Sequence, residues 1–168
     1  MQRRRVQEDQ LKIRDYYVEG DLISAEVQQI GSFDGKIQLH TRTQKYGKLK
    51  NGMLMKVDNN LIRRMKSHIH EFFFQPSIGV ILGTNGYIWI FSKQDEEDSF
   101  ASPVERKLMA ILRNSILVLQ KARVPIYKET ILKVLDMQAE TEIEPRDMGE
   151  NFEVLAQTAK QMIEIEIS

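Results

Sequence analysis

The stretch VILGTNGYIWI, residues 80–90, limits the folds open to this chain more than any other. Runs of aliphatic, β-branched and aromatic residues flank its centre, Gly83-Thr84-Asn85-Gly86, and neither run has helical spacing. An Asn-Gly pair between two such runs is among the strongest short-range signals for a β-hairpin. The sequence therefore predicts two antiparallel strands joined by a tight turn, with structural roles for Gly83, Asn85 and Gly86.

The same four residues also fit a second pattern, the Gly-x-x-Gly loop with which a KH domain clamps a nucleic-acid backbone. Such a loop joins two helices and usually carries a basic residue at one of its variable positions. Here the variable positions are Thr84 and Asn85, neither of which is cationic, and the flanks predict strands. We therefore favour the structural turn over the clamp.

A second hairpin is predicted in DLISAEVQQIGSFDGKIQLHTR, residues 21–42. Apolar and polar residues alternate before Asp34-Gly35, a turn dipeptide that accepts positive φ. After this turn, Ile37 and Leu39 face one way, and the residues facing the other way are Lys36, Gln38, His40 and Arg42. The pattern predicts an antiparallel hairpin with one apolar face and one polar, partly cationic face.

Helices are predicted after residue 100. Ser102-Pro103-Val104-Glu105 is a capping box with proline at the first helical position, and the helix that follows ends before Pro125. Further helices are expected over residues 127–138 and from about residue 145, and a short one over residues 6–17. Core-facing positions are Leu108, Met109, Leu112, Ile116 and Leu119 in the first helix, and Met148, Phe152, Leu155, Ala159 and Met162 in the last. Strands followed by helices predict an α+β fold with helices on one face of an antiparallel sheet.

Basic residues are concentrated in the middle of the chain. The 24 basic and 24 acidic residues balance overall, but residues 36–70 hold nine bases and one acid, a net charge of +8. Cations interleaved with a tyrosine and histidines favour a local surface for a polyanion over an ordinary solvated surface. The candidate residues of this surface, which would be the RNA-binding residues if the polyanion is RNA, are Lys36, His40, Arg42, Lys45, Tyr46, Lys48, Lys50, Arg63, Arg64 and Lys66.

The sequence offers no recognisable catalytic or metal-binding set. His68 and His70 would share one face of a strand, but a metal site needs a third ligand and Glu71 points the other way. The chain has no cysteine, no Gly-rich phosphate loop with a lysine, and no serine with a convincing base partner. Its apolar runs fall short of the ~18 residues of a membrane span. We expect no enzymatic activity, no cofactor, no metal and no membrane partner.

Four motifs occur in a fixed order: GDLISAEV at residues 20–27, LHTR at 39–42, KYGKL at 45–49, and GTNG followed by YIWI at 83–90. In this order they resemble the RNA-binding cap subunits of the RNA exosome, of the ribosomal RNA-processing protein 4 (exosome component 2) type. The resemblance runs from about Arg3 to Phe91. In that family the Gly-x-Asn-Gly signature is largely structural, in agreement with the turn favoured above.

The resemblance implies the C-terminal part of an OB-fold RNA-binding domain of the ribosomal-protein S1 type over residues 1–56. A divergent KH-like domain with a helical C-terminal region would follow over residues 57–168. It also implies a non-catalytic subunit that contacts RNA, ring subunits and other caps, and guides RNA into the ring for 3′-to-5′ processing and decay. Ribosomal RNA processing and RNA turnover would place it in nucleus, nucleolus and cytoplasm. The alternative is a structural scaffold subunit whose basic patch contacts proteins instead of RNA.

The first of these domains would be incomplete. An OB barrel has five strands, whereas two are readable before the last expected barrel strand. We therefore expect an N-terminal sandwich and the first barrel strands to be missing from the sequence. The remaining hairpin would then expose an apolar face and unpaired strand edges.

Overall fold

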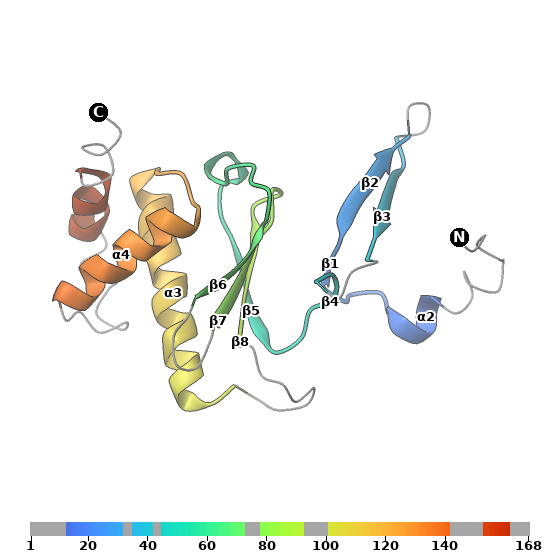
Figure 1. Ribbon diagram of the computed structural model, residues 1–168, viewed down its shortest axis with the longest axis horizontal. Helices are drawn as coiled ribbons and strands as arrows, with labels where there is room; N and C mark the ends of the chain where they lie inside the picture. The colour runs from blue at the N-terminus through green and yellow to red at the C-terminus, as the bar shows by residue number, and fades with distance from the viewer. Residues whose placement is uncertain are drawn as a thin grey trace. The chain divides into compact units, whose positions relative to one another are not determined.

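The structure is a computed structural model that describes residues 13–31, 35–41, 45–72, 78–92, 101–141 and 153–161. The chain divides into two compact units, unit 1 (Met1–Lys50) and unit 2 (Asn51–Ser168), and Figure 1 labels their elements. Unit 1 contains α2 (Ile13–Tyr16), β1 (Ile23–Ser24), β2 (Glu26–Ile30), β3 (Ile37–His40) and β4 (Gly47–Lys48). Unit 2 contains β5 (Gly52–Lys56), the 3₁₀ turn η1 (Asn59–Leu61), β6 (Ile69–Phe72), β7 (Ile78–Leu82), β8 (Tyr87–Ser92), α3 (Pro103–Ala122) and α4 (Lys128–Thr141).

Unit 1 is built from two short antiparallel strand pairs. Strand β2 pairs with β3, with Glu26 opposite His40 and Ile30 opposite Ile37, and β1 pairs with β4. The predicted hairpin is therefore confirmed, and Gly35 has the positive φ, +64°, that its turn requires. Asp34, the other residue of the turn dipeptide, lies outside the described residues, as do residues 6–12 of the predicted first helix.

The apolar residues of this hairpin are exposed. Val27 and Leu39, which lie opposite each other, are each 54% exposed, and Ile30 and Ile37 are more so. This matches the exposed apolar face that the sequence led us to expect. The buried hydrophobic residues of the described chain all lie in unit 2, from Met55 onward.

The sheet of unit 2 has four strands in the order β5-β8-β7-β6, and each neighbouring pair is antiparallel. The strands on either side of the predicted 83–86 turn, β7 and β8, form its centre. Their inward side chains are fully buried: Ile78, Val80, Leu82, Ile88 and Ile90. The hairpin predicted from residues 80–90 is thus the middle of the unit 2 core.

Strand β5 belongs to unit 2, whereas the sequence-based limits had placed it at the end of the first domain, residues 1–56. Gly52–Lys56 pairs along its whole length with Tyr87–Phe91 of β8, and Met55 is buried in the core. The predicted limit differs from the structure because β5 is held by a long-range backbone pairing, which local sequence patterns do not encode.

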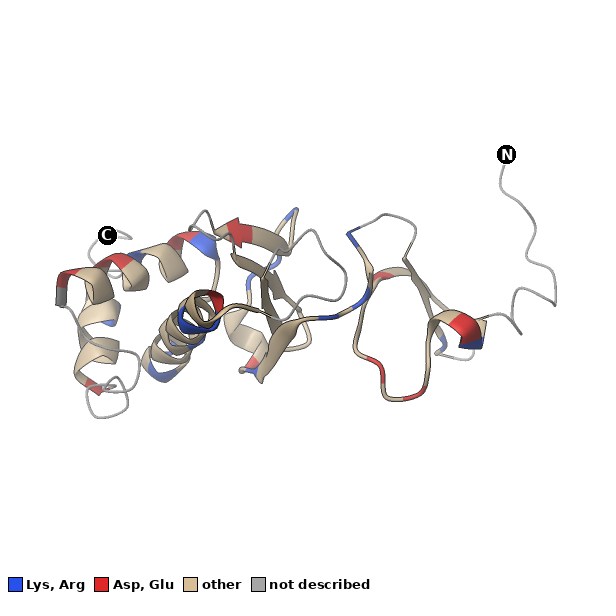
Figure 2. Ribbon diagram, turned by 90° about the horizontal axis from the view of Figure 1, so that it is seen from below, with Lys and Arg blue, Asp and Glu red and all other residues tan. Residues whose placement is uncertain are grey.

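Helices α3 and α4 lie on one side of this sheet (Figure 1), and α3 packs against β7 and β8. The predicted apolar stripe of α3 is confirmed, since Met109, Leu112, Ile116 and Leu119 are buried. Acidic and basic residues are mixed along the helices (Figure 2). Helix α4 begins one residue later and ends three residues later than predicted. None of the described helices is long and apolar enough to cross a membrane.

A further helical stretch covers residues 153–161, where Leu155, Ala156 and Ala159 are buried. It corresponds to the predicted last helix. The other apolar positions proposed for that helix, Met148, Phe152 and Met162, lie outside the described residues. The α+β fold, strands first and helices after, agrees with the sequence prediction.

Candidate nucleic-acid interface

The Gly83–Gly86 turn joins two strands. Gly83 N–H donates to Tyr87 O at 2.9 Å, Gly86 N–H donates to Gly83 O at 2.9 Å, and Asn85 Oδ1 accepts from Tyr87 N–H at 3.2 Å. Gly86 O in turn accepts from Val57 N–H at 2.8 Å, which ties the turn to the end of β5. These bonds use the turn's backbone groups for the fold, unlike a clamp that presents its backbone to a nucleic acid.

Unit 1 presents several of the predicted RNA-binding residues at its surface. Lys36, Lys45 and Lys50 are exposed, and Tyr46 is half-buried in the turn before β4. Exposed ammonium groups can pair with phosphates, and a tyrosine that follows one of them in the sequence can stack on an unstacked base. Arg42 lies outside the described residues.

Two further predicted residues of unit 1 have acidic neighbours. Lys48 Nζ lies 2.7 Å from Asp21 Oδ1. The hydrogen bond from Lys48, followed by that from Val18 N–H, holds the pKa of the Asp21 carboxyl below its ordinary value of 3.8. His40 Nε2 lies 3.7 Å from Glu26 Oε2. Both side chains are therefore partly engaged within unit 1, which reduces what they can offer a phosphate.

In unit 2 the predicted cations lie between η1 and β6. Arg63, Arg64 and Lys66 are exposed, and the Arg63 guanidinium stacks over the Tyr127 ring, 5.2 Å from its centroid. A parallel bridge between Ile62 and Ile126 brings the two segments together. A planar guanidinium beside an aromatic ring can pair with phosphate and stack on a base.

Tyr127 is a candidate that the sequence analysis missed. It lies more than sixty residues from Arg63, and only the bridge at Ile62 and Ile126 places it there. An aromatic residue in the polar connection after Pro125 was the one available signal. Tyr87, whose ring lies 5.4 Å from Lys56 Nζ, is a second missed aromatic residue beside a cation.

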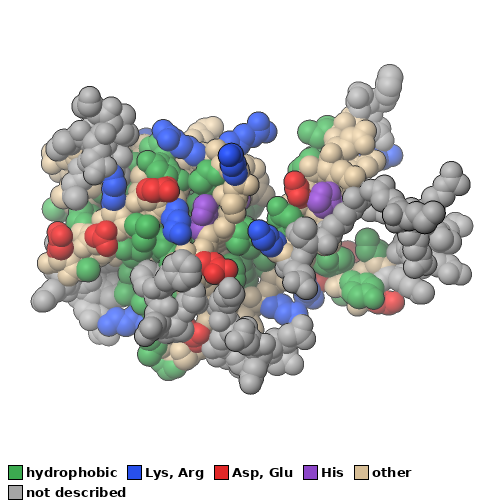
Figure 3. Space-filling model, in the orientation of Figure 1, with side chains coloured by type: hydrophobic (Ala, Val, Ile, Leu, Met, Phe, Trp, Pro, Cys, Tyr) green, Lys and Arg blue, Asp and Glu red, His purple; other side chains and the backbone are tan. Residues whose placement is uncertain are grey.

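The two histidines of unit 2 serve the fold. His68 Nδ1 lies 2.8 Å from Leu82 O, and its Nε2 lies 3.3 Å from Met65 N, so both ring nitrogens contact backbone groups. Burial, and next the positive charge of Lys128, lowers the pKa of His70 below 6.5. Figure 3 shows a histidine beside basic side chains on this face. Among the described residues, no three His, Asp or Glu side chains gather to hold a metal ion.

Comparison with known proteins gives two family matches. Residues 1–29 match the family model described as "RRP4, S1 domain", and residues 52–96 match the model of the KH domain. The KH match begins at β5, the first strand of the unit 2 sheet. An S1-type segment followed by a KH domain defines a protein of the RNA-binding class.

Three curated relatives share the name exosome complex component RRP4. The chain is 38% identical to "Exosome complex component RRP4" from Bos taurus over 98% of this chain and 59% of the relative, and 42% identical to that of Mus musculus over 77% and 47%. It is 49% identical to that of Saccharomyces cerevisiae over 52% of this chain and 24% of the relative. The chain belongs to the RRP4 family of exosome complex components, and it spans between a quarter and three fifths of these relatives' lengths.

Proposed function

We propose that this chain is a non-catalytic cap subunit of the RNA exosome that binds RNA and guides it into the ring for 3′-to-5′ processing and decay. The supporting observation is the order of an S1-type match and a KH match in a chain whose relatives are named exosome complex component RRP4. Its partners would be RNA, the ring subunits and the other caps. Ribosomal RNA processing and RNA turnover would place it in nucleus, nucleolus and cytoplasm.

In this proposal the cationic side chains contact the phosphate backbone of the RNA. Lys45 and Lys50 in unit 1, and Arg64 and Lys66 in unit 2, contact phosphates without reading sequence. Tyr46 and the Arg63–Tyr127 pair stack on unpaired bases, and each stacked base contributes roughly 1–3 kcal/mol. The Gly83–Gly86 turn holds strands together and makes no contact with RNA.

The salt dependence of RNA binding tests this proposal. Each lost phosphate contact lowers the slope of log K against log salt by about 0.7 for a single strand. The double variant Lys45→Ala/Lys50→Ala should therefore flatten the slope by about 1.4 in filter-binding titrations of poly-U RNA. Lys48 is better left unchanged, because its removal would also take away the partner of Asp21.

Arg113→Ala is the matched control, since it removes an exposed charge from α3, outside the proposed interface. An unchanged slope for the double variant, or an equal change for Arg113→Ala, would remove Lys45 and Lys50 from the RNA site.

The second candidate function is a structural scaffold whose basic residues contact acidic protein surfaces. It is favoured by the acidic neighbours of Lys48 and His40, which lower the local positive charge. Co-purification separates the two functions. If ring subunits are retained with the full chain while poly-U RNA fails to bind at physiological salt, the scaffold function replaces the RNA-guiding one.

A further inference from the structure

Ser67 is the one exposed serine in the described part of the chain. The other serines there are half-buried or buried: Ser24, Ser92, Ser102 and Ser115. Ser67 Oγ donates to Ile69 O at 3.0 Å, and this hydrogen bond is exposed to solvent. The Ser67 hydroxyl is therefore accessible to a modifying enzyme and takes no part in the core.

Three exposed cations come directly before this serine. Arg63, Arg64 and Lys66 lie four, three and one residues before Ser67, and residues 59–70 contain no acidic side chain. Basic residues on the N-terminal side of a serine are a charge pattern by which many protein kinases select their substrates. Thr84 and Thr158 are also exposed, but neither has a basic residue among the five that precede it.

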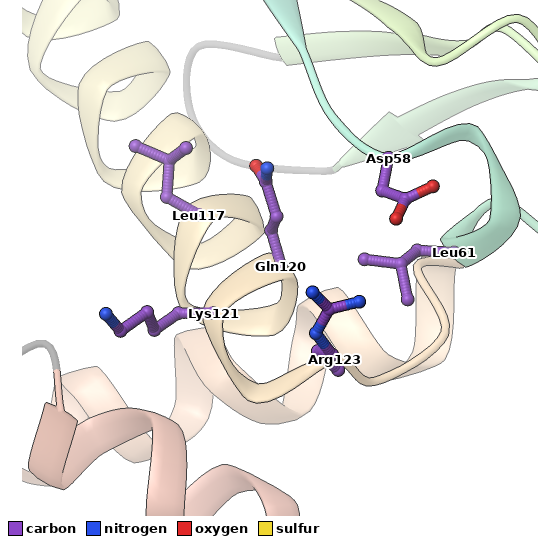
Figure 4. A pocket seen from close by; sticks show the side chains of 6 residues that line it. All are labelled: Asp58, Leu61, Leu117, Gln120, Lys121 and Arg123. Carbon is purple, nitrogen blue, oxygen red and sulfur yellow. The ribbon is translucent and has the colours of Figure 1, made fainter.

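The segment that carries this pattern is a surface connection held at both ends. Residues 63–68 belong to no helix or strand. At the N-terminal end, Leu61 lines a pocket together with Leu117 of α3 (Figure 4), and Ile62 forms a bridge with Ile126. At the C-terminal end, His68 O accepts from Leu82 N–H at 2.8 Å. Exposed connections of this kind are where enzymes reach a folded chain.

The strand that follows limits this access only weakly. Strand β6 begins at Ile69 and lies at the edge of the sheet, so among the described strands it pairs with β7 alone. The first residues of an edge strand can open locally at lower free energy than a central strand. A kinase can therefore bind residues on both sides of Ser67 without disturbing the centre of the sheet.

We propose that Ser67 is a phosphorylation site for a protein kinase that recognises arginine upstream of serine, and that its phosphate weakens RNA binding by the neighbouring cations. In the reaction, Ser67 Oγ forms a bond to the γ-phosphorus of ATP, and the bond from that phosphorus to the β–γ bridging oxygen breaks. The hydroxyl proton passes to the catalytic carboxylate of the kinase, and ADP leaves. The effect on RNA rests on the proposed function, whereas the site does not.

The phosphate would change the charge of the segment. Residues 63–67 hold three bases and no acid, a net charge of +3. A phosphoserine adds roughly −1.5 to −2 near neutral pH, which leaves about +1. Its oxygens would pair with Arg64 and Lys66, the two cations of this segment that the proposed function assigns to RNA phosphates. Arg63 differs from them because its guanidinium stacks on the Tyr127 ring.

The test of the site is incubation of the purified full chain with ATP and a calmodulin-dependent protein kinase that requires arginine three residues before serine. Mass spectrometry of the resulting peptides should place one phosphoryl group on Ser67 and none on Thr84 or Thr158. Ser67→Ala should abolish incorporation at this segment. The same reaction after thermal unfolding of the chain shows whether the folded chain presents the serine.

Arg64→Ala tests the recognition without touching the hydroxyl. It should lower kcat/KM for the kinase roughly tenfold or more, the size of one lost hydrogen bond to a charged group. Arg113→Ala removes an exposed arginine from α3 and is the matched control, with kcat/KM unchanged. Both arginines are exposed, so the circular dichroism spectra of the variants should match that of the unmodified chain.

Filter binding of poly-U tests the effect on RNA. The phosphorylated chain should bind roughly fivefold or more weakly, as for a typical coupling between two sites. Its slope of log K against log salt should be flatter by up to about 1.4, the value for two lost phosphate contacts. Ser67→Ala treated with the kinase should bind poly-U as the unmodified chain does.

The site would be ruled out by the absence of phosphate on Ser67, by phosphorylation only after unfolding, or by equal kcat/KM for Arg64→Ala and the unmodified chain. Phosphate on Ser67 with unchanged poly-U binding would overturn the effect on RNA. Failure of the unmodified chain to bind poly-U counts against the proposed function, because incorporation at Ser67 is measured without RNA.

Discussion

At the scale of single residues, Gly86 has the most restrictive environment in the turn. Its φ is +86°, and a Cβ built there would lie 2.5 Å from Val57 O. That oxygen is backbone, so it cannot move aside as the end of a flexible side chain can. The restriction comes from the fold, because Gly86 O also accepts from Val57 N–H.

Gly86→Ala should therefore destabilise unit 2 by roughly 1–3 kcal/mol, the usual size of backbone strain in the left-handed region with a steric contact added. Urea unfolding followed by far-UV circular dichroism measures the change. Thr84→Ala, at an exposed position of the same turn, should change the free energy of unfolding by less than about 0.5 kcal/mol. Equal changes in the free energy of unfolding for the two substitutions would show that the contact with Val57 O does not restrict residue 86 to glycine.

His70 gives unit 2 a stability that depends on pH. Its pKa is lowered by burial and by Lys128, an effect to which His68 adds and which Glu129 partly offsets. Above pH 6.5 the imidazole is neutral in both folded and unfolded chains. As the pH falls below 6.5, His70 binds a proton in the unfolded chain but stays neutral in the folded chain. The free energy of unfolding therefore decreases until the pH reaches the lowered pKa of the folded state.

The expected result is a lower urea midpoint at about pH 5.5 than at about pH 7.5, and a smaller difference in His70→Leu. Asp21 does not interfere, because its lowered pKa affects stability only as the pH falls below 3.8. The same pH dependence in wild type and His70→Leu would assign the effect to other groups.

The residue scale also shows what local sequence could predict. The roles of Gly83 and Gly86 follow from a dipeptide signal and flanking strands, all within eleven residues. The place of Tyr127 beside Arg63 could not be predicted, because the two residues lie on segments far apart in the chain. The ion pair between Lys48 and Asp21 depends in the same way on the pairing of β1 with β4.

At the scale of elements, the start of α3 combines a local signal with a tertiary contact. The predicted capping box is present, with Ser102 Oγ accepting from Glu105 N–H at 3.3 Å and Glu105 accepting from Ser102 N–H. Glu105 is also 3% exposed and accepts a hydrogen bond from Ser92 Oγ at the end of β8. One carboxylate thus holds the start of α3 against the end of β8.

Glu105→Ala should cost roughly 2–4 kcal/mol, because it removes a cap and leaves the buried Ser92 hydroxyl without its acceptor. Thermal unfolding measured by calorimetry checks this value. Ser92→Ala/Glu105→Ala should lose less than the sum of the single variants, since the Ser92 hydroxyl is then absent. Glu129→Ala, in the first turn of α4 but exposed, is the control and should cost less than about 1 kcal/mol.

Elements were predictable where their signals are local. The β7–β8 hairpin and α3 have turn, cap and periodicity signals of their own, and both are where the sequence placed them. The partner of β5 was not predictable, because its pairing with β8 spans more than thirty residues and nothing in GMLMK specifies it.

At the scale of the whole molecule, the two units differ in how much apolar surface they bury. The core residues with less than a tenth of their surface exposed lie in unit 2, among the described residues. In unit 1 even the paired strands β2 and β3 expose their apolar side chains. Since burial is the main source of stability, unit 1 should open at much lower free energy.

Hydrogen exchange measured by mass spectrometry should therefore show fast exchange in peptides from residues 13–50 and slow exchange in those from β7, β8 and α3. Limited proteolysis should cut within unit 1 first. Equal protection of β2–β3 and β7–β8 in the full chain at low protein concentration would contradict this difference.

The boundary between the units adds one mechanical consequence. Unit 1 ends at Lys50 and β5 begins at Gly52, so the chain crosses through Asn51 alone, which has φ +54°. Because a single residue separates Lys50 from β5, the connection between them is very short. If RNA bound to Lys45 and Lys50 were pulled, the force would therefore be transmitted through the backbone to β5. The hydrogen bonds between β5 and β8 would then resist that force.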